Sequence, residues 1–340
     1  MRLVRERGLR AEDVDMVVGA SGGPKWFALA GLDRYLFGVL AGAPRKRPMH
    51  LIGSSVGSWR MACLAQNDAV AALHRAHQAY LEQSYSARPT PQEVSTTVAA
   101  MLDTLFGKSG EKEILAHPWA RLHILTTEFR GLLASERRAL LAAGLVLAAG
   151  GNLLTRRSLR LQMRRVVVHH AAEPSPLRFL SDFPTQLLPL TAANLRPALL
   201  ASGSLPLLMP AVRLPGGNGR ACMDGGFIDY HPAFDFGAGE GLVLYPNYFP
   251  YIVPGWFDKT LPWRRSRSEH LARVLLLAPS PEFVARLPHG KIPDRDDFAR
   301  LDQGSRLHYW RQVVAESERL ADELQELQAT HQLADRLKPL

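Results

Sequence analysis

The chain has 340 residues, of which 46% are hydrophobic and 21% are charged, enough for one large domain or two small ones with a sizeable core. Its formal net charge of +9 is a modest basic excess, which suits anionic lipid as well as nucleic acid. The two cysteines, Cys63 and Cys222, exclude a disulfide framework and lie in no zinc-binding pattern, so we expect reduced cysteines and no metal.

The N-terminal segment shows no sign of a secretory signal. The first fifteen residues carry charges throughout and contain no apolar run before a cleavage site, so we expect a cytoplasmic protein. The most apolar stretch, residues 139–154, is interrupted by glycines and is shorter than the roughly 20 residues of a membrane span. It is therefore not expected to cross a membrane.

Two successive units of strand, glycine turn and helix are predicted near the N-terminus. Pro24 suits the first turn of the first helix, which is expected to end near Gly38. Two such units in succession favour a parallel sheet covered by helices. The predicted strands are 14–18 and 49–52, the turns are 19–23 and 53–57, and the second helix is 58–66.

The rest of the chain continues this alternation and is expected to form one domain, residues 1–340. A helical insertion at about residues 130–165 ends in an arginine run. Apolar residues at helical spacing predict an amphipathic helix at about 305–338, packed against the body or against a second subunit. Further helices are predicted at 69–83, 94–106 and 195–201, and strands at 122–127, 166–169, 221–223, 242–245 and 274–278.

The segment 53–57 has the pattern G-x-S-x-G between a predicted strand and a predicted helix. The small residues Gly53 and Gly57 let the backbone turn sharply and expose the Oγ of Ser55 at the N-terminus of the helix. The pattern therefore predicts Ser55 as a nucleophile. An ordinary strand-to-helix turn is the alternative.

Gly22 and Gly23 end the first predicted strand, where their amide groups can converge on an oxygen that develops negative charge. They are the predicted oxyanion hole. A phosphate-binding loop is the alternative, but Pro24 occupies a position that the P-loop pattern reserves for glycine, and G-x-G-x-x-G is absent.

Asp224 follows a short predicted strand and precedes Gly225 and Gly226. A carboxylate at a strand end beside such a permissive turn can approach a serine on a neighbouring strand closely. Asp224 is therefore a candidate partner for Ser55, although it stands 169 residues away in the chain. An ordinary turn aspartate is the alternative.

These motifs resemble those of the patatin-like phospholipases. The match covers residues 14–66 and 195–235, where ASGSLPLLMPAV precedes DGGFIDYHP. The resemblance implies a three-layer α/β/α sandwich with a mostly parallel central sheet, and a serine–aspartate dyad without histidine. Carried over by position, Ser55 is the nucleophile, Asp224 is the base, Gly22 and Gly23 form the oxyanion hole, and Lys25, Gly53, Gly57, Gly225 and Gly226 support them.

Four positions depart from the pattern of this family. Ser21 stands where a third glycine is common, and Lys25 replaces an arginine. Trp26 replaces a glycine and is expected to narrow the space that a ligand has at the start of the helix. His231 stands where the family often has asparagine. A histidine-assisted mechanism centred on His231 therefore stays open as an alternative.

The resemblance implies an esterase that cleaves phospholipid, lysophospholipid or acylglycerol without metal or organic cofactor. Acyl transfer, thioester hydrolysis and lipid binding with weak catalysis are alternatives. Residues 139–165 and 245–267 combine apolar or aromatic side chains with arginines, which suits transient membrane contact; packing on the protein is the alternative. Arginines within 156–165 are the candidate contact for nucleic acid, which is not expected as a partner.

Overall fold

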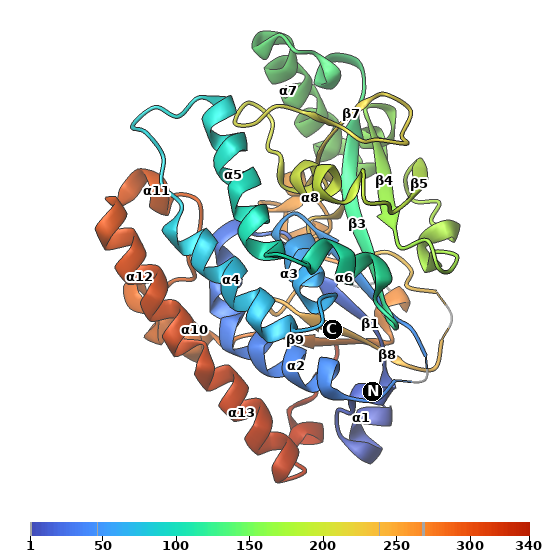
Figure 1. Ribbon diagram of the computed structural model, residues 1–340, viewed down its shortest axis with the longest axis vertical. Coiled ribbons are helices and arrows are strands. Elements are labelled where there is room, and N and C mark those ends of the chain that lie inside the picture. The colour runs from blue at the N-terminus through green and yellow to red at the C-terminus, as the bar shows by residue number, and fades with distance from the viewer. Residues whose placement is uncertain (1, 46, 238, 267–268) are drawn as a thin grey trace.

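A central sheet of nine strands with helices packed around it organises the computed structural model, which describes residues 2–45, 47–237, 239–266 and 269–340 (Figure 1). The strand order is β5-β4-β3-β2-β1-β8-β9. Adjacent strands on this path run parallel except β3 and β4, and β7 pairs antiparallel with β3 and β6. The strands are β1 Val14–Gly19, β2 Met49–Ser54, β3 Ala120–Phe129, β4 Met163–His169, β5 Thr185–Pro189, β6 Val212–Arg213, β7 Ala221–Asp224, β8 Leu242–Pro246 and β9 Val274–Leu277.

The helices confirm the predicted α/β alternation and add several short elements. They are α1 Arg2–Arg7, α2 Ala30–Gly42, α3 Val56–Leu64, α4 Ala69–Glu82, α5 Pro91–Phe106, α6 Gly110–Ala116, α7 Arg138–Leu154, α8 Leu195–Gly203, α9 Gly226–Asp229, α10 Pro281–Arg286, α11 Asp297–Arg300, α12 Gln303–Glu316 and α13 Glu318–Ala329. The α2 helix runs past the predicted end at Gly38, because Leu40 continues its buried face.

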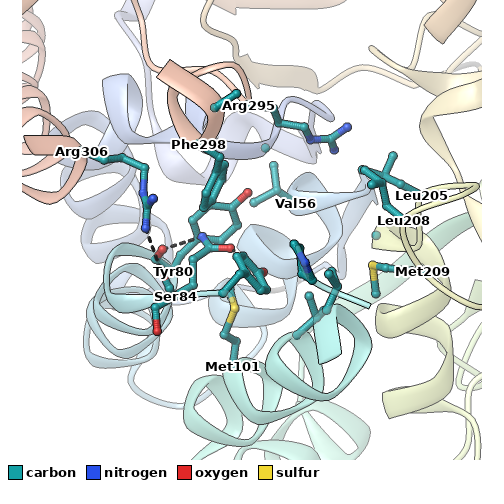
Figure 2. A pocket seen from close by; sticks show the side chains of 18 of the residues that line it. Val56, Tyr80, Ser84, Met101, Leu205, Leu208, Met209, Arg295, Phe298 and Arg306 are labelled. Atoms are coloured by element: carbon teal, nitrogen blue, oxygen red, sulfur yellow. Dashed lines mark hydrogen bonds between the residues drawn. The ribbon is translucent and has the colours of Figure 1, made fainter. Parts of the chain in front are cut away.

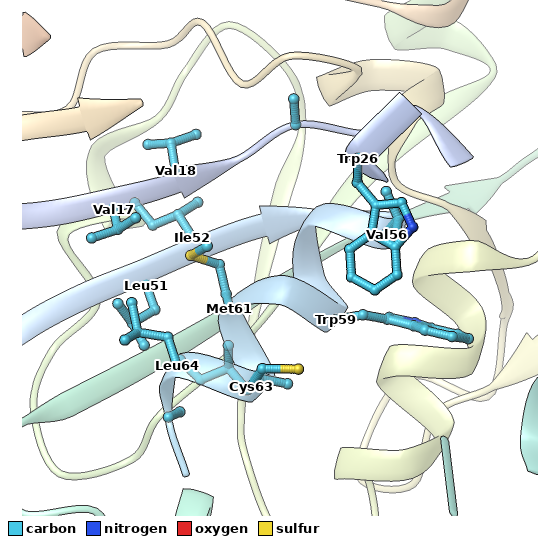
Figure 3. Close-up of a cluster of buried hydrophobic side chains, with 14 of the residues drawn as sticks. Val17, Val18, Trp26, Leu51, Ile52, Val56, Trp59, Met61, Cys63 and Leu64 are labelled. Atoms are coloured by element: carbon cyan, nitrogen blue, oxygen red, sulfur yellow. The ribbon is translucent and has the colours of Figure 1, made fainter. Parts of the chain in front are cut away.

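The core is centred on β1, β2 and α3. Val17 and Val18 of β1 and Leu51 and Ile52 of β2 are fully buried, and Met61 of α3 packs with them (Figure 3). Strands with helices on both faces bury both sets of side chains, which explains their short continuous apolar runs. Burial of each large apolar side chain contributes roughly 1.5–3 kcal/mol, so this centre holds the ends of β1 and β2 rigidly.

The C-terminal segment forms two helices, α12 and α13, rather than the single predicted helix at 305–338. Ser317 joins them, and its Oγ accepts the backbone N–H of Gly31 in α2 at 2.8 Å. A Cβ on Gly31 would lie 2.6 Å from the Cα of Glu318, so the junction fits closely against α2. The α13 helix packs on α2 and α12 packs on α4, which places both against the body of the protein.

The predicted insertion between β3 and β4 is helical, with α7 at one end of the molecule (Figure 1). The interpretation of residues 156–165 as a contact for nucleic acid required one exposed basic face. The arginine run does not form such a face. Arg164 and Arg165 belong to β4, and Arg165 is buried between Asp182 and Asp229. Arg156 pairs with Asp258 at 3.2 Å. Arg157 and Arg160 remain exposed.

No helix in the described ranges combines the length and the apolar character that crossing a membrane requires. The other candidate membrane segment, 245–267, is mostly packed on the protein: Tyr248, Ile252 and Val253 are buried. Trp263 is exposed, and Arg267 lies outside the described residues.

Candidate active site

Strand β3 brings Ser55 and Asp224 together. Ser54, the last residue of β2, lies opposite Leu125 of β3, and Asp224, the last residue of β7, lies opposite Thr126. The two strands therefore end at adjacent positions on the same edge of β3, pointing at each other. The Oγ of Ser55 donates a hydrogen bond of 2.8 Å to Oδ2 of Asp224, and both residues are buried.

Ser55 has the backbone conformation of a sharp strand-to-helix turn. Its φ of 54° lies in the left-handed region, which costs a residue other than glycine about 1–3 kcal/mol. Ser202 of α8 helps to hold this conformation, because its Oγ accepts the N–H of Ser55 at 2.9 Å and donates to the carbonyl of Leu125 at 2.7 Å. The sequence analysis predicted no role for Ser202, although Ser202 lies in the ASGSLP segment that resembles the family pattern.

Close backbone contacts explain the predicted supporting glycines. A Cβ on Gly57 would lie 2.1 Å from the carbonyl oxygen of Gly19, and a Cβ on Gly53 would lie 2.5 Å from the carbonyl oxygen of Gly57. A Cβ on Gly225 would lie 2.1 Å from the carbonyl oxygen of Leu125. The turns that carry Ser55 and Asp224 therefore fit against β1 and β3 only without side chains.

The environment of Asp224 makes its carboxylate a stronger base than a free aspartate. Burial raises its pKa, while the positive charges of Arg295 and Lys259 and hydrogen bonds from Gly226 and Ser55 oppose the rise. The Gly226 N–H donates to Oδ1 at 2.7 Å, which leaves Oδ2 aimed at Ser55. An aspartate with a raised pKa accepts a proton more readily.

The two predicted oxyanion glycines lie on neighbouring cavities. Gly23, with φ of 55°, lines the same cavity as Ser55, whereas Gly22 lines the adjacent one. In the described part of the chain neither amide donates to a protein acceptor, so both are free for a ligand oxygen. A Cβ on Gly22 would lie 2.6 Å from the ring of Tyr248, which explains why only glycine fits there.

His231 supports the glycine turn and does not contact the dyad. Its Nδ1 accepts the N–H of Val253 at 3.1 Å, so Nε2 carries the proton and donates to the Tyr248 hydroxyl at 2.8 Å. Tyr248 in turn donates to the carbonyl of Ser21. Burial lowers the pKa of His231 from 6.5 to about 3, so the ring is neutral. Tyr248, which the sequence analysis missed, thus links His231 to the turn.

Ser21 and Trp26, two further departures from the family pattern, both make buried contacts. The Ser21 hydroxyl is buried and donates to the Oγ of Ser54 at 3.1 Å, tying the glycine turn to the end of β2. Trp26 does not narrow the site as expected, because it is buried against His77 and Tyr80 and lines neither cavity.

Two cavities meet at the site. The apolar cavity, of about 600 Å³, opens beside Ser55; Figure 2 shows Arg295 and Phe298 on one side of it and Leu205, Leu208 and Met209 on another. The second, of about 690 Å³, we call the cationic cavity because Lys25, Lys259 and Arg295 line it. Within the described residues, no three His, Cys, Asp or Glu side chains are grouped to hold a metal ion.

Comparison with protein-family models finds a match to this chain. A family model described as "Patatin-like phospholipase" matches residues 17–236, which is well over half of the chain and includes both turns and Asp224. Neither the search of curated proteins nor that of solved structures found a match to the chain. The observed architecture, a mostly parallel sheet flanked by helices, agrees with the α/β/α fold of this family.

Proposed function

The chain belongs to the patatin-like phospholipase family, and from this premise we propose that it is a serine hydrolase that cleaves carboxylic esters of lipids. The observation that carries the proposal is the 2.8 Å hydrogen bond between two buried groups, Ser55 and Asp224, at the facing ends of two strands. The substrate classes are phospholipid, lysophospholipid and acylglycerol, with the acyl chain in the apolar cavity.

The mechanism uses this dyad in two half-reactions. Asp224 accepts the Ser55 proton while Oγ attacks the ester carbonyl, and the amides of Gly22 and Gly23 stabilise the oxyanion. Collapse of the tetrahedral intermediate breaks the bond to the alcohol, which leaves with the proton from Asp224. Water then gives its proton to Asp224 and attacks the acyl-enzyme. The fatty acid leaves, and Ser55 regains its proton.

Release of fatty acid from lysophospholipid and from monoacylglycerol tests this function. We expect the wild-type protein to release fatty acid and Ser55→Ala to release none. Formation of a new ester when an alcohol is added would indicate acyl transfer, and thioester cleavage alone would indicate a thioesterase. Lipid binding without any acyl release by the folded wild type would instead support a lipid-binding relative.

The pH dependence of hydrolysis should contain a step from Asp224 and none from His231. The base must be ionised, and burial raises its pKa, so kcat/KM for a neutral ester should increase with pH through a midpoint above the usual aspartate value of about 3.9. No step that depends on His231 is expected near 6.5, because the pKa of His231 is about 3. A step near 6.5 that disappears in His231→Ala would contradict the dyad and favour the histidine alternative.

We also propose that α7 makes transient contact with an anionic lipid bilayer. Leu145 and Ala148 pack on a small buried apolar cluster beneath the helix. The outer face is apolar too, since Val146 is 71% exposed, Leu147 58% and Leu154 87%. The helix has no charged side chain after its first residue, and an uncovered face of this kind needs an apolar partner.

Charges at both ends of α7 favour an anionic bilayer as that partner. Residues 136–138, Glu-Arg-Arg, are exposed where the helix begins, and Arg157 and Arg160 are exposed after it. Each basic residue near an anionic bilayer contributes about 1 kcal/mol. Leu145, on the inner face of α7, also lines the cationic cavity, so the helix lies beside the site that would receive lipid.

A change of the outer face of α7 should weaken vesicle binding at least tenfold. We expect wild-type protein to float with phosphatidylglycerol vesicles and the double variant Val146→Glu/Leu147→Glu to bind at least tenfold more weakly, because glutamate is both polar and repelled by the bilayer. Val39→Glu, at an exposed apolar position on α2, is the matched control. Equal flotation of all three proteins, or a wild-type dimer that the double variant splits, would contradict membrane contact.

A further inference from the structure

The cationic cavity concentrates positive charge that the dyad chemistry does not use. Lys25 comes from the glycine turn, whereas Lys259 and Arg295 come from the chain beyond residue 236, outside the family match. Among the residues that the structure describes, none of the three forms an ion pair with a carboxylate. Their charges are therefore available to a ligand.

The two acidic residues that line this cavity already have partners. Asp294 accepts from the Nζ of Lys291 at 3.1 Å, and Asp296 lies 3.6 Å from Arg300. Lys291 is shared with Asp297 at 2.8 Å, and attraction to Lys25 also lowers the pKa of Asp294. The cavity still has a net positive character, because Lys291 and Arg300 add to the three cations of its lining, whereas Asp294, Asp296 and Asp297 are the carboxylates beside them.

Aromatic rings hold two of these cations in place without neutralising them. The Nζ of Lys259 lies 3.4 Å from the ring centre of Trp256 and 4.1 Å from that of Tyr230, and the guanidinium of Arg295 lies 5.2 Å from the Trp256 ring. Cation–π contacts orient a positive charge yet leave its N–H groups free to bind an anion.

Arg295 stands at the junction of the two cavities. It lines the apolar cavity together with Ser55 and the cationic cavity together with Gly22. Its Nε lies 3.2 Å from the position that a Cβ on Gly23 would take, so the guanidinium adjoins the predicted oxyanion glycine. A molecule that extends from the apolar cavity across Ser55 would therefore reach the cationic cavity with its other end.

We propose that the cationic cavity binds an anionic group, phosphate or carboxylate, on the alcohol part of the ester. This inference rests on the proposed ester hydrolysis and narrows its substrate class to lipids with an anionic leaving group, in preference to neutral acylglycerols. An anion would also relieve the crowding of charge: burial and repulsion from Arg295 and Lys25 lower the pKa of Lys259 to about 7.

A matched pair of substrates tests the inference. Oleoyl lysophosphatidic acid and monooleoylglycerol share an acyl chain and differ by one phosphate. We expect wild-type kcat/KM to be at least tenfold higher for the phosphate ester, and Arg295→Gln to bring the ratio of the two kcat/KM values close to one. Arg295→Lys should restore part of the preference for the phosphate ester. Arg319→Gln, an exposed arginine paired with Glu316, is the charge-matched control.

A measurement of anion binding distinguishes failure of this inference from failure of the proposed hydrolysis. Calorimetric titration of Ser55→Ala with glycerol 3-phosphate should show binding that Arg295→Gln or Lys259→Gln weakens at least tenfold, and glycerol should not bind. If hydrolysis fails but this pattern holds, the cavity binds anions and the esterase proposal falls. Equal rates on both esters without binding of glycerol 3-phosphate would overturn the inference. Equal binding of inorganic phosphate and glycerol 3-phosphate would overturn the leaving-group assignment.

Discussion

Asp224→Asn is expected to lower kcat for ester hydrolysis about 10³-fold or more while the protein stays folded. Asparagine cannot accept the Ser55 proton, and a positioned general base contributes roughly 10²- to 10⁴-fold. The amide oxygen can still accept the N–H of Gly226, which holds Oδ1 of the aspartate at 2.7 Å, so the turn should keep its shape. The measurement is steady-state hydrolysis of a short neutral ester at pH 8.

The same variant should be at least as stable as the wild type. Because burial raises the pKa of Asp224 in the folded state, its ionised form costs stability at every pH above that pKa, and a neutral asparagine removes the cost. Asp235→Asn, at an exposed aspartate on the same segment, is the control and should change neither rate nor melting temperature. A folded Asp224→Asn protein with a near-normal rate would exclude Asp224 as the base.

Arg165→Met should destabilise the fold by about 3–5 kcal/mol, because it leaves a buried carboxylate without a counter-charge. The fully buried guanidinium of Arg165 binds Asp229 at 2.7 and 2.8 Å and Asp182 at 2.7 and 2.8 Å. Asp229 ends α9, the helix that follows Asp224, so loss of this ion pair should also loosen the site. Urea unfolding followed by circular dichroism gives the free energy of unfolding.

The neighbouring residue provides a matched control. Arg164 lies on the same strand, is partly exposed and is 3.8 Å from Glu128, so Arg164→Met should change the free energy of unfolding by less than about 1 kcal/mol. The double variant Arg165→Met/Asp229→Leu should recover much of the loss, since apolar replacement of a whole buried pair is often neutral. Equal stability of Arg165→Met and wild type would show that Asp229 does not depend on its partner.

The nucleophile turn could be predicted because its requirements are local. A serine with φ of 54° between a buried strand and a helix needs small neighbours, and Gly53 and Gly57 are visible in the sequence. The first strands could be predicted for a similar reason, since strands covered on both faces are short apolar runs. The strand end and the glycines after it singled out Asp224, and the family pattern assigned it the role of base, because no local feature connects it to Ser55.

The arrangement of the site depends on contacts that no local pattern encodes. The meeting of β2 and β7 end to end follows from their register on β3, where Leu125 and Thr126 are adjacent. Arg165 belongs to an arginine run typical of a surface, yet it is buried because two aspartates from distant segments neutralise it. The break at Ser317 likewise follows from its contact with Gly31, 286 residues earlier.

Two of the three cations of the cationic cavity could not be predicted from the sequence for the same reason, whereas Lys25 belongs to the predicted glycine turn. Lys259 and Arg295 lie in loops without a recognisable motif, and only the folded chain places them beside Gly22 and Gly23. Ser202 was in a segment that matched the family, but its role requires a helix that packs against the end of β2.

Labelling with a fluorophosphonate followed by peptide mapping tests the central claim most directly, because the reagent modifies only an activated serine. The account predicts one labelled peptide, containing Ser55, and no labelling of folded Ser55→Ala. Labelling at a serine other than Ser55, or no labelling of the folded wild-type protein, would contradict it.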